Sequence, residues 1–99
     1  MDESKKGALR THHQGLRTGL LVGNILPDLR PVLTDVEYSR IRDREDNPSR
    51  VDELIDVLLT KENRHFDAFC DALEQNGYEH WAKTLRGEVE KLEGLLMLA

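Results

Sequence analysis

Apolar residues recur along much of the 99-residue chain at the three- and four-residue spacing of an amphipathic helix. The clearest run places five apolar side chains on one helical face: Val51, Leu54, Ile55, Leu58 and Leu59. A second run has the same spacing: Phe66, Phe69, Cys70 and Leu73. A third continues towards the C-terminus: Tyr78, Trp81, Ala82, Leu85, Val89, Leu92 and Leu96. No segment alternates apolar and polar residues as a strand does, so the pattern predicts an all-α protein.

The segment LTDVEYSRI carries a strong signal for the start of a helix. Thr34 and Glu37 have the T-x-x-E spacing of a capping box, in which each side chain satisfies a free backbone N–H. Within this short helix we expect Val36 and Ile41 to point inward, because both are apolar. The helix should end before Asn47-Pro48, since proline disfavours helical backbone in the residue that precedes it.

Two further signals bound the helices that follow. Asn47 is expected to cap the helix of residues 51–59, with Pro48 at its first position, where a missing N–H costs nothing. Gly77 is expected to end the helix that contains residues 66–73, because glycine readily adopts the left-handed backbone found after many helices. The turn between these two helices is only a few residues long, which favours an antiparallel arrangement.

The N-terminal part predicts two more helices. The first contains Leu9, Leu16 and Leu20 and is expected to bend near Gly15. The second contains Val22, Ile25, Leu26 and Leu29, and either Gly19 or Gly23 makes the turn between them. The whole chain therefore predicts a six-helix antiparallel bundle with an extended or additional C-terminal helix. Nine residues are expected in its core: Leu16, Ile25, Ile41, Leu54, Leu58, Phe66, Phe69, Trp81 and Leu85.

Composition and charge narrow the class of protein. Charged residues make up 33% and hydrophobic residues 38%, and no apolar run approaches the ~18 residues of a membrane span, so no membrane partner is expected. The net charge of −5 argues against nucleic acid. Residues 1–50 hold nine basic and eight acidic residues (+1), whereas residues 51–99 hold five and eleven (−6). Cys70 is the single cysteine, which fits a reducing, cytoplasmic location.

The sequence offers little catalytic chemistry. His12 and His13 are adjacent and point to different sides of a helix, so they make a poor pair of metal ligands. Cys70 lies on an apolar face, where a buried thiol is expected rather than a nucleophile. Phosphate-binding glycine loops and metal-ligand spacings such as HExxH or CxxC are missing from the sequence. We therefore expect neither an enzyme nor a cofactor or bound metal.

Three segments, taken in order, resemble the caspase recruitment domain, a branch of the death-fold superfamily. VLTDVEYSRI resembles the family's third helix, RVDELIDVLLTKENRHFDAFCDAL its fourth and fifth, and NGYEHWAKTLRGE its sixth. The likeness covers about 70 residues, from Leu16 to Arg86. One departure is Lys61-Glu62-Asn63, where the family usually has Lys-Gly after its fourth helix.

The resemblance implies a non-catalytic module that binds another caspase recruitment domain, or itself, in apoptotic or innate immune signalling. It implies a basic face on or beside the first and fourth helices: Arg10, Arg17, Arg50, Lys61 and Arg64. An acidic face would lie on the second and third helices: Asp28, Asp35, Glu37 and Asp43. The charged stretch after the third helix would form an assembly loop: Arg40, Arg42 and Arg44. When the basic face of one molecule docks on the acidic face of the next, the contacts repeat without closing. Both a filament and a dimer therefore stay open as forms of assembly.

The apolar C-terminal segment supports an alternative interpretation. We divide the chain into a bundle of residues 1–87 and a helical extension of residues 88–99, which is rich in apolar side chains: Leu92, Leu95, Leu96, Met97 and Leu98. Such an apolar surface suggests an oligomerisation module, with the extension continuing into a longer helix. The extension packing back onto the bundle is equally compatible with the sequence.

Overall fold

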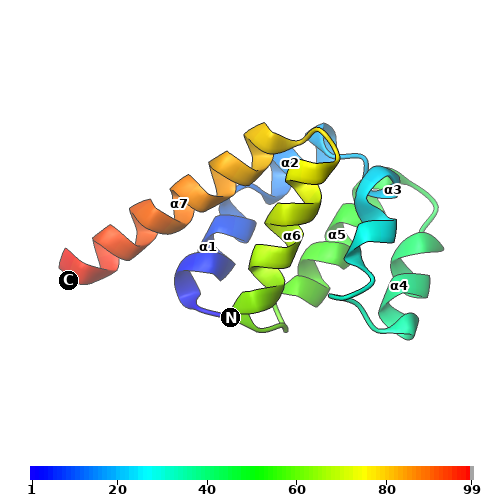
Figure 1. Cartoon of the computed structure of the whole chain (residues 1–99), viewed down its shortest axis with the longest axis horizontal. Helices are drawn as coiled ribbons and strands as arrows, with labels where there is room; N and C mark the ends of the chain where they lie inside the picture. Colours follow the sequence, from blue (N-terminus) through cyan, green and yellow to red (C-terminus); the bar gives the residue numbers. More distant parts are fainter. Residues whose placement is uncertain (99) are drawn as a thin grey trace.

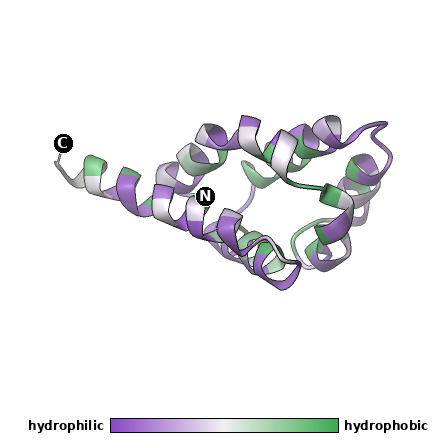
Figure 2. Cartoon of the chain, turned by 90° about the horizontal axis from the view of Figure 1, so that it is seen from above, coloured by the Kyte–Doolittle hydropathy of each residue, from purple (hydrophilic) through white to green (hydrophobic). Residues whose placement is uncertain are grey.

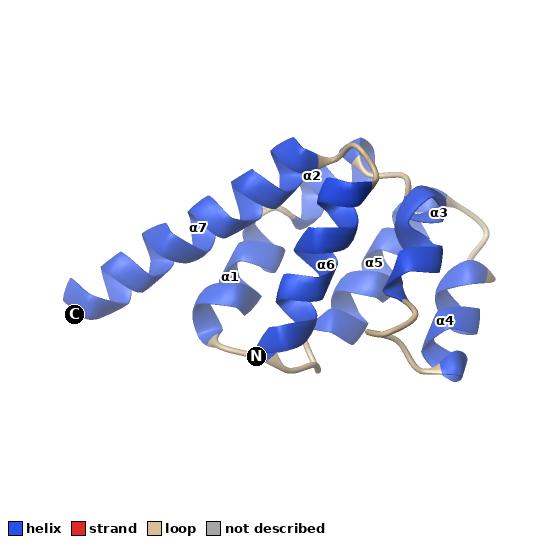
Figure 3. Ribbon diagram, in the orientation of Figure 1, coloured by secondary structure: helices blue, strands red, loops and turns tan. Residues whose placement is uncertain are grey.

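The computed structural model describes the backbone of residues 1–98 and the side chains of residues 1–95. Within this range all regular secondary structure is helical, with loops and turns between the helices and no strand, as Figures 1 and 3 show. The elements are α1 (Glu3–Thr11), α2 (His13–Gly19), α3 (Val22–Ile25), the 3-10 helix η1 (Leu26–Leu29), α4 (Asp35–Arg42), α5 (Asn47–Leu58), α6 (Asn63–Gln75) and α7 (Glu79–Leu98). The predicted all-helical bundle of the death-fold type is confirmed. Its six helices are the pair α1 and α2, the pair α3 and η1, and α4 to α7.

The first helix breaks at His12, not at Gly15 as the sequence suggested. His12 leaves the helical geometry (φ −100°, ψ 6°) because the two halves pack on different partners: α1 lies along α7, and α2 lies on α5. Gly15 stays inside α2, and the turn into α3 follows Gly19 rather than Gly23. The bend is therefore a product of tertiary packing and not of glycine.

Two of the expected helix signals are confirmed and one is wrong. Thr34 and Glu37 make both hydrogen bonds of the capping box at α4, and Gly77 has a left-handed φ of 84°. The cap of α5 is Asp46, whose carboxylate accepts the backbone N–H of Ser49 at 2.8 Å. Asn47 lies one residue further, inside the helix, where its side chain is used differently.

Asn47 joins the start of α5 to the link between α2 and α3. Its Nδ2 donates to the carbonyl of Leu20 at 2.7 Å, and its Oδ1 accepts the N–H of Val22 at 2.9 Å. Tyr78 supports the same link from the turn before α7, because its hydroxyl accepts the N–H of Leu21 at 3.3 Å. Backbone groups that α2 and α3 leave unpaired are thus satisfied by side chains from distant parts of the chain.

Eight of the nine residues expected in the core are buried; the ninth, Trp81, is partly buried. Its ring lies against α2 at two glycines, where an added Cβ would come within 2.8 Å (Gly15) or 2.9 Å (Gly19) of the indole. The indole N–H also donates to the Gly19 carbonyl at 3.2 Å. Val36 contradicts the inward orientation expected of it, since 66% of its surface is exposed.

The last helix, α7, runs without a break across the 87/88 boundary and projects past the rest of the bundle (Figures 1 and 2). Beyond residue 87 it still packs on α1: a Cβ on Gly7 would lie 2.8 Å from Leu92, and Ser4 donates to Glu93 at 3.2 Å. Leu95 is 56% exposed, and the side chains of residues 96–99 lie outside the described residues. Among the helices described, none has the length and apolarity to cross a membrane.

Candidate protein-interaction surface

The helix α4 is attached to the bundle by a small apolar contact and by several charged side chains. Ile41 is its one buried residue, Tyr38 packs partly buried against the core, and the charged contacts with α5 centre on the buried carboxylate of Glu53. Arg40 Nε lies 3.2 Å and Arg44 Nη2 3.3 Å from the same Glu53 Oε1. Two of the three arginines expected in an assembly loop thus bind inward. The third, Arg42, forms an exposed pair with Asp43 at 3.0 Å.

Lys61 and Glu37 were expected on opposite faces, but the structure brings them together. Lys61 Nζ donates to Glu37 Oε1 at 2.7 Å, and both side chains are largely buried (16% and 19% exposed). Burial raises the pKa of Glu37, but hydrogen bonds from Lys61 and Thr34 outweigh it, so the pKa lies below its ordinary 4.5. This pair fixes the capped end of α4 to the turn between α5 and α6, and neither member is free for a partner.

Basic side chains of α2 and α5 form a cluster that we call the basic cluster: Arg17 and Arg50, with Arg10 of α1 as an exposed outlier. Arg17 is paired with Asp52 of α5, with Nε 3.1 Å from Oδ1, whereas Arg50 Nε donates to the carbonyl of Arg44 at 3.2 Å. The Ser49 N–H lowers the pKa of Asp46, and the charges of Arg17 and Arg50 lower it further. Within the described side chains no ion pair involves Arg10 or Arg50.

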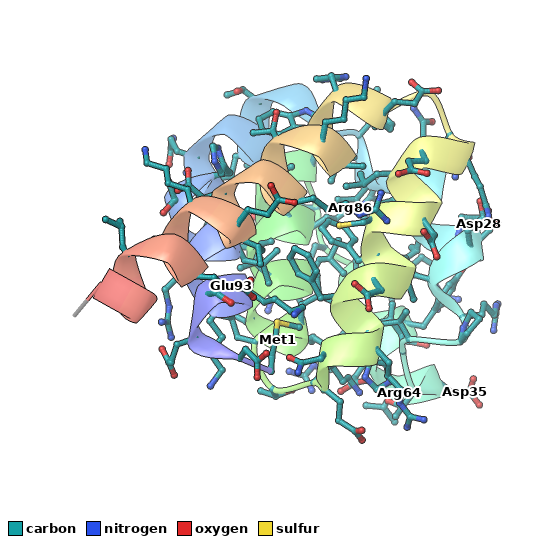
Figure 4. The ribbon with its side chains drawn as sticks, turned by 60° about the vertical axis from the view of Figure 1, so that its left-hand side comes forward. Met1, Asp28, Asp35, Arg64, Arg86 and Glu93 are labelled. Atoms are coloured by element: carbon teal, nitrogen blue, oxygen red, sulfur yellow. The ribbon has the colours of Figure 1, made fainter. Side chains whose placement is uncertain are left out.

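Arg64 belongs to α6 rather than to α5, and its side chain is exposed (Figure 4). It pairs with Glu62 at 3.5 Å, and both side chains are about three-quarters exposed (75% and 73%). An exposed pair of this kind is worth at most about 1 kcal/mol, so it leaves Arg64 available to a partner. Arg64 is, however, on a different helix from the basic cluster.

Three of the four acidic residues expected at the docking face are exposed. Asp35 sits in the first turn of α4 with its side chain in solvent, 4.0 Å from Arg30, and Asp43 follows the end of the same helix. Asp28 of η1 accepts a hydrogen bond from Asn76 at 2.7 Å. We call these three residues the acidic group: Asp28, Asp35 and Asp43. Figure 4 shows Asp28 and Asp35 at the surface of the bundle.

A shallow groove of about 560 Å³ runs along the outer face of α4, and sequence reasoning missed it. Two members of the acidic group, two arginines and two smaller residues line it: Asp35, Asp43, Arg40, Arg44, Val36 and Ser39. Val36 supplies an exposed apolar surface between the charges. The only sequence signal for this exposed surface was the position of Val36 directly after Asp35, which places Val36 away from the helical face that buries Ile41.

In the part of the chain that the structure describes, the thiol and the two N-terminal histidines are occupied by burial or by contacts with carboxylates. Cys70 is buried, and burial raises the pKa of its thiol to about 12, so it stays protonated at neutral pH. His12 Nε2 lies 3.1 Å from Glu88 Oε1 of α7, and His13 Nε2 lies 2.7 Å from Asp52 Oδ1 of α5. In the described part of the chain, no three ligand-type residues gather in a way that would hold a metal ion.

Comparison with known proteins agrees with this geometry. The family model described as "Caspase recruitment domain" matches residues 1–89, which is most of the chain. A comparison with curated proteins gives no match. Caspase recruitment domains are interaction modules, not enzymes, and they bind domains of their own kind in apoptotic and immune signalling. The match and the all-helical bundle agree: the chain belongs to the caspase recruitment domain family.

Proposed function

We propose that this domain docks onto a second caspase recruitment domain, including another copy of itself, through its basic cluster and its acidic group. The observation that supports this is the distribution of charge left after internal pairing. Glu37, Lys61, Arg40 and Arg44 are committed to bonds within the molecule. On the α1, α2 and α5 side, Arg10 and Arg50 make no ion pair within the described side chains, while on η1 and α4 Asp28 is exposed and Asp35 and Asp43 form only exposed, weak pairs with Arg30 and Arg42.

Ion pairs between the two surfaces do not supply enough binding free energy for docking. Exposed ion pairs contribute only ~0–1 kcal/mol each, so three pairs do not hold a stable complex alone. The exposed Val36 lies beside Asp35 in the groove on α4 and offers apolar contact area close to the acidic group. A small apolar centre ringed by charged residues is the usual layout of an interface, in which the charges set orientation and partner choice. Repetition of the two unlike surfaces would build an open assembly.

The signalling role follows from the same docking. We infer that the domain acts in the cytoplasm as an adaptor in apoptotic or innate immune signalling, in a pathway that leads to caspases or to NF-κB. Family membership supports this inference. Assembly would bring the proteins attached to each domain close together, which raises their effective concentration without any chemistry by the domain itself.

Paired charge reversals test the docking. Arg50→Glu and Asp35→Lys should each weaken self-association at least tenfold in sedimentation velocity, because each places like charges across the interface. An equimolar mixture of the two variants should associate again, since each supplies the surface that the other lacks. Lys83→Glu on α7 is the matched control: it reverses an exposed charge outside both surfaces. Circular dichroism checks that every variant is folded. Wild-type association by Arg50→Glu would refute this mode of docking.

A second function, oligomerisation through α7, is favoured by one observation: the helix projects beyond the bundle with Leu95 exposed. Deleting residues 88–99 is a poor test, because that segment contacts α1 through Leu92 and Glu93. Leu95→Glu is sharper, since it alters only exposed surface. Loss of association in Leu95→Glu, with Arg50→Glu unaffected, would favour oligomerisation through α7 over charge docking.

A further inference from the structure

The two adjacent histidines at the break between α1 and α2 bind carboxylates on different helices. His12 contacts Glu88 of α7, and its ring also meets the edge of Trp81 with centroids 6.3 Å apart. His13 contacts Asp52 of α5 at 2.7 Å and is about one-third exposed. His13 therefore lies within the proposed docking surface, whereas His12 faces the other side of the bend.

His13 shares a single carboxylate oxygen with an arginine of the basic cluster. Arg17 Nε is also 3.1 Å from Asp52 Oδ1. This Nε is buried but makes no hydrogen bond, because its N–H does not point at the oxygen that His13 already binds. One carboxylate thus serves two basic side chains. With neutral His13 the charges of Arg17 and Asp52 cancel, and with protonated His13 the same three residues carry one net positive charge.

We propose that protonation of His13 strengthens the basic cluster and so tightens docking onto an acidic partner surface as the pH falls from about 7.5 to about 6. This inference rests on the proposed function. Histidine is the side chain whose ordinary titration falls in that interval. Carboxyl groups ordinarily titrate near pH 4, so the acidic surface of the partner keeps its charge. The added charge therefore meets an unchanged acidic surface.

The surroundings of His13 contain both signs of charge. From α5 and its cap come Asp52, Arg50 and Asp46, and Arg17 follows one turn later on α2 itself. The half-helix α1, which also packs against α2, contributes Arg10 as its nearest charged residue in sequence. After the hydrogen bonds from Ser49, the charges of Arg17 and Arg50 both lower the pKa of Asp46, so both guanidinium groups lie near that carboxylate.

The test measures self-association of the full chain at about pH 7.5 and about pH 6 in the wild type, His13→Gln and His12→Gln. Glutamine keeps a hydrogen-bond donor near Asp52 but cannot gain a proton. We expect wild-type dissociation constants to fall about three- to five-fold at the lower pH, in line with one added exposed pair. His13→Gln should lose this dependence. His12→Gln, which removes the neighbouring imidazole, should retain it.

The outcomes separate this inference from the proposed function. Association that is equally tight at both pH values, or a pH dependence that persists in His13→Gln, would overturn the role of His13 and leave charge docking intact. Association that is absent at both pH values would overturn both. A double-mutant cycle of His13→Gln with Asp52→Asn, read by chemical unfolding, checks the contact itself: the two residues should be more strongly coupled at about pH 5.5 than at about pH 8.

Discussion

The helices α6 and α4 lie in one small bundle but are attached to it by different forces. Helix α6 buries five apolar side chains: Phe66, Phe69, Cys70, Ala72 and Leu73. Helix α4 buries only Ile41, packs Tyr38 partly against the core, and is otherwise joined by the Glu37–Lys61 pair and by two arginines that converge on Glu53. Apolar burial is hardly affected by salt or acid, whereas ion pairs weaken under both. High salt or low pH should therefore loosen the attachment of α4 to the bundle while α6 stays docked.

The largest loss of stability should come from removing a buried apolar side chain of α6. Phe69→Ala removes a fully buried ring and should lower the free energy of unfolding by about 3–5 kcal/mol in urea denaturation. Val36→Ala, on the exposed face of α4, is the control and should change it by less than about 0.5 kcal/mol. A cost below about 1 kcal/mol for Phe69→Ala would contradict the burial described for α6.

The close approach of α7 to α2 should also be sensitive to added volume. Gly15→Ala would place a Cβ 2.8 Å from the ring of Trp81 and should cost about 1–3 kcal/mol through overpacking. Gly87→Ala is a matched helical glycine with nothing within 4 Å of its Cβ, and it should stabilise the protein by about 0.5–1 kcal/mol. Thermal unfolding measures both, and equal effects at the two positions would rule out a tight contact.

The ionic attachment of α4 should give a smaller effect that depends on salt. Glu53→Gln keeps the side-chain shape but removes the charge shared by Arg40 and Arg44, whose side chains are about half exposed (57% and 52%). We expect a loss of about 1–2 kcal/mol at low salt. The loss should shrink in about 1 M NaCl, where charges are screened within ~3 Å. Phe69→Ala, measured alongside, should cost the same at both salt concentrations.

The smallest effect on stability should come from protonating Glu37 in acid. The folded-state pKa of Glu37 lies below the ordinary 4.5, so its pair with Lys61 stabilises the protein fully above about pH 4.5. That contribution should disappear as the pH falls through the lowered pKa. Unfolding free energies measured between about pH 5.5 and about pH 3 should therefore fall less steeply in Glu37→Gln than in the wild type. Glu45→Gln, at an exposed position, should follow the wild-type slope.

Local patterns in the sequence predicted the helices well because each helix has an apolar face. The capping box at Thr34 and the end at Gly77 were also readable, since both depend on neighbouring residues alone. The bend at His12 was not, because it results from α1 and α2 packing on different helices. Asn47 had the right chemistry for a cap, but Asp46 took that position and left Asn47 to bridge to Leu20 and Val22.

The docking surfaces were harder to predict than the fold. Sorting residues by helix placed Lys61 on a basic face and Glu37 on an acidic one, but the two side chains neutralise each other across 24 residues of sequence. The same is true of Arg40 and Arg44, whose partner Glu53 is on α5. Charge available to a partner depends on which pairs form inside the molecule, and these follow from packing between helices rather than from the residues of one helix.

The contact between Trp81 and the two glycines of α2 has a practical consequence. Trp81 is the sole tryptophan of the chain, and its indole N–H is bonded to the Gly19 carbonyl. Its ultraviolet emission therefore originates from one known junction, where the second half of the bent helix meets α7. A red shift of that emission would signal water reaching the junction. The molecule thus contains a native optical reporter for the docking of α2, without any attached dye.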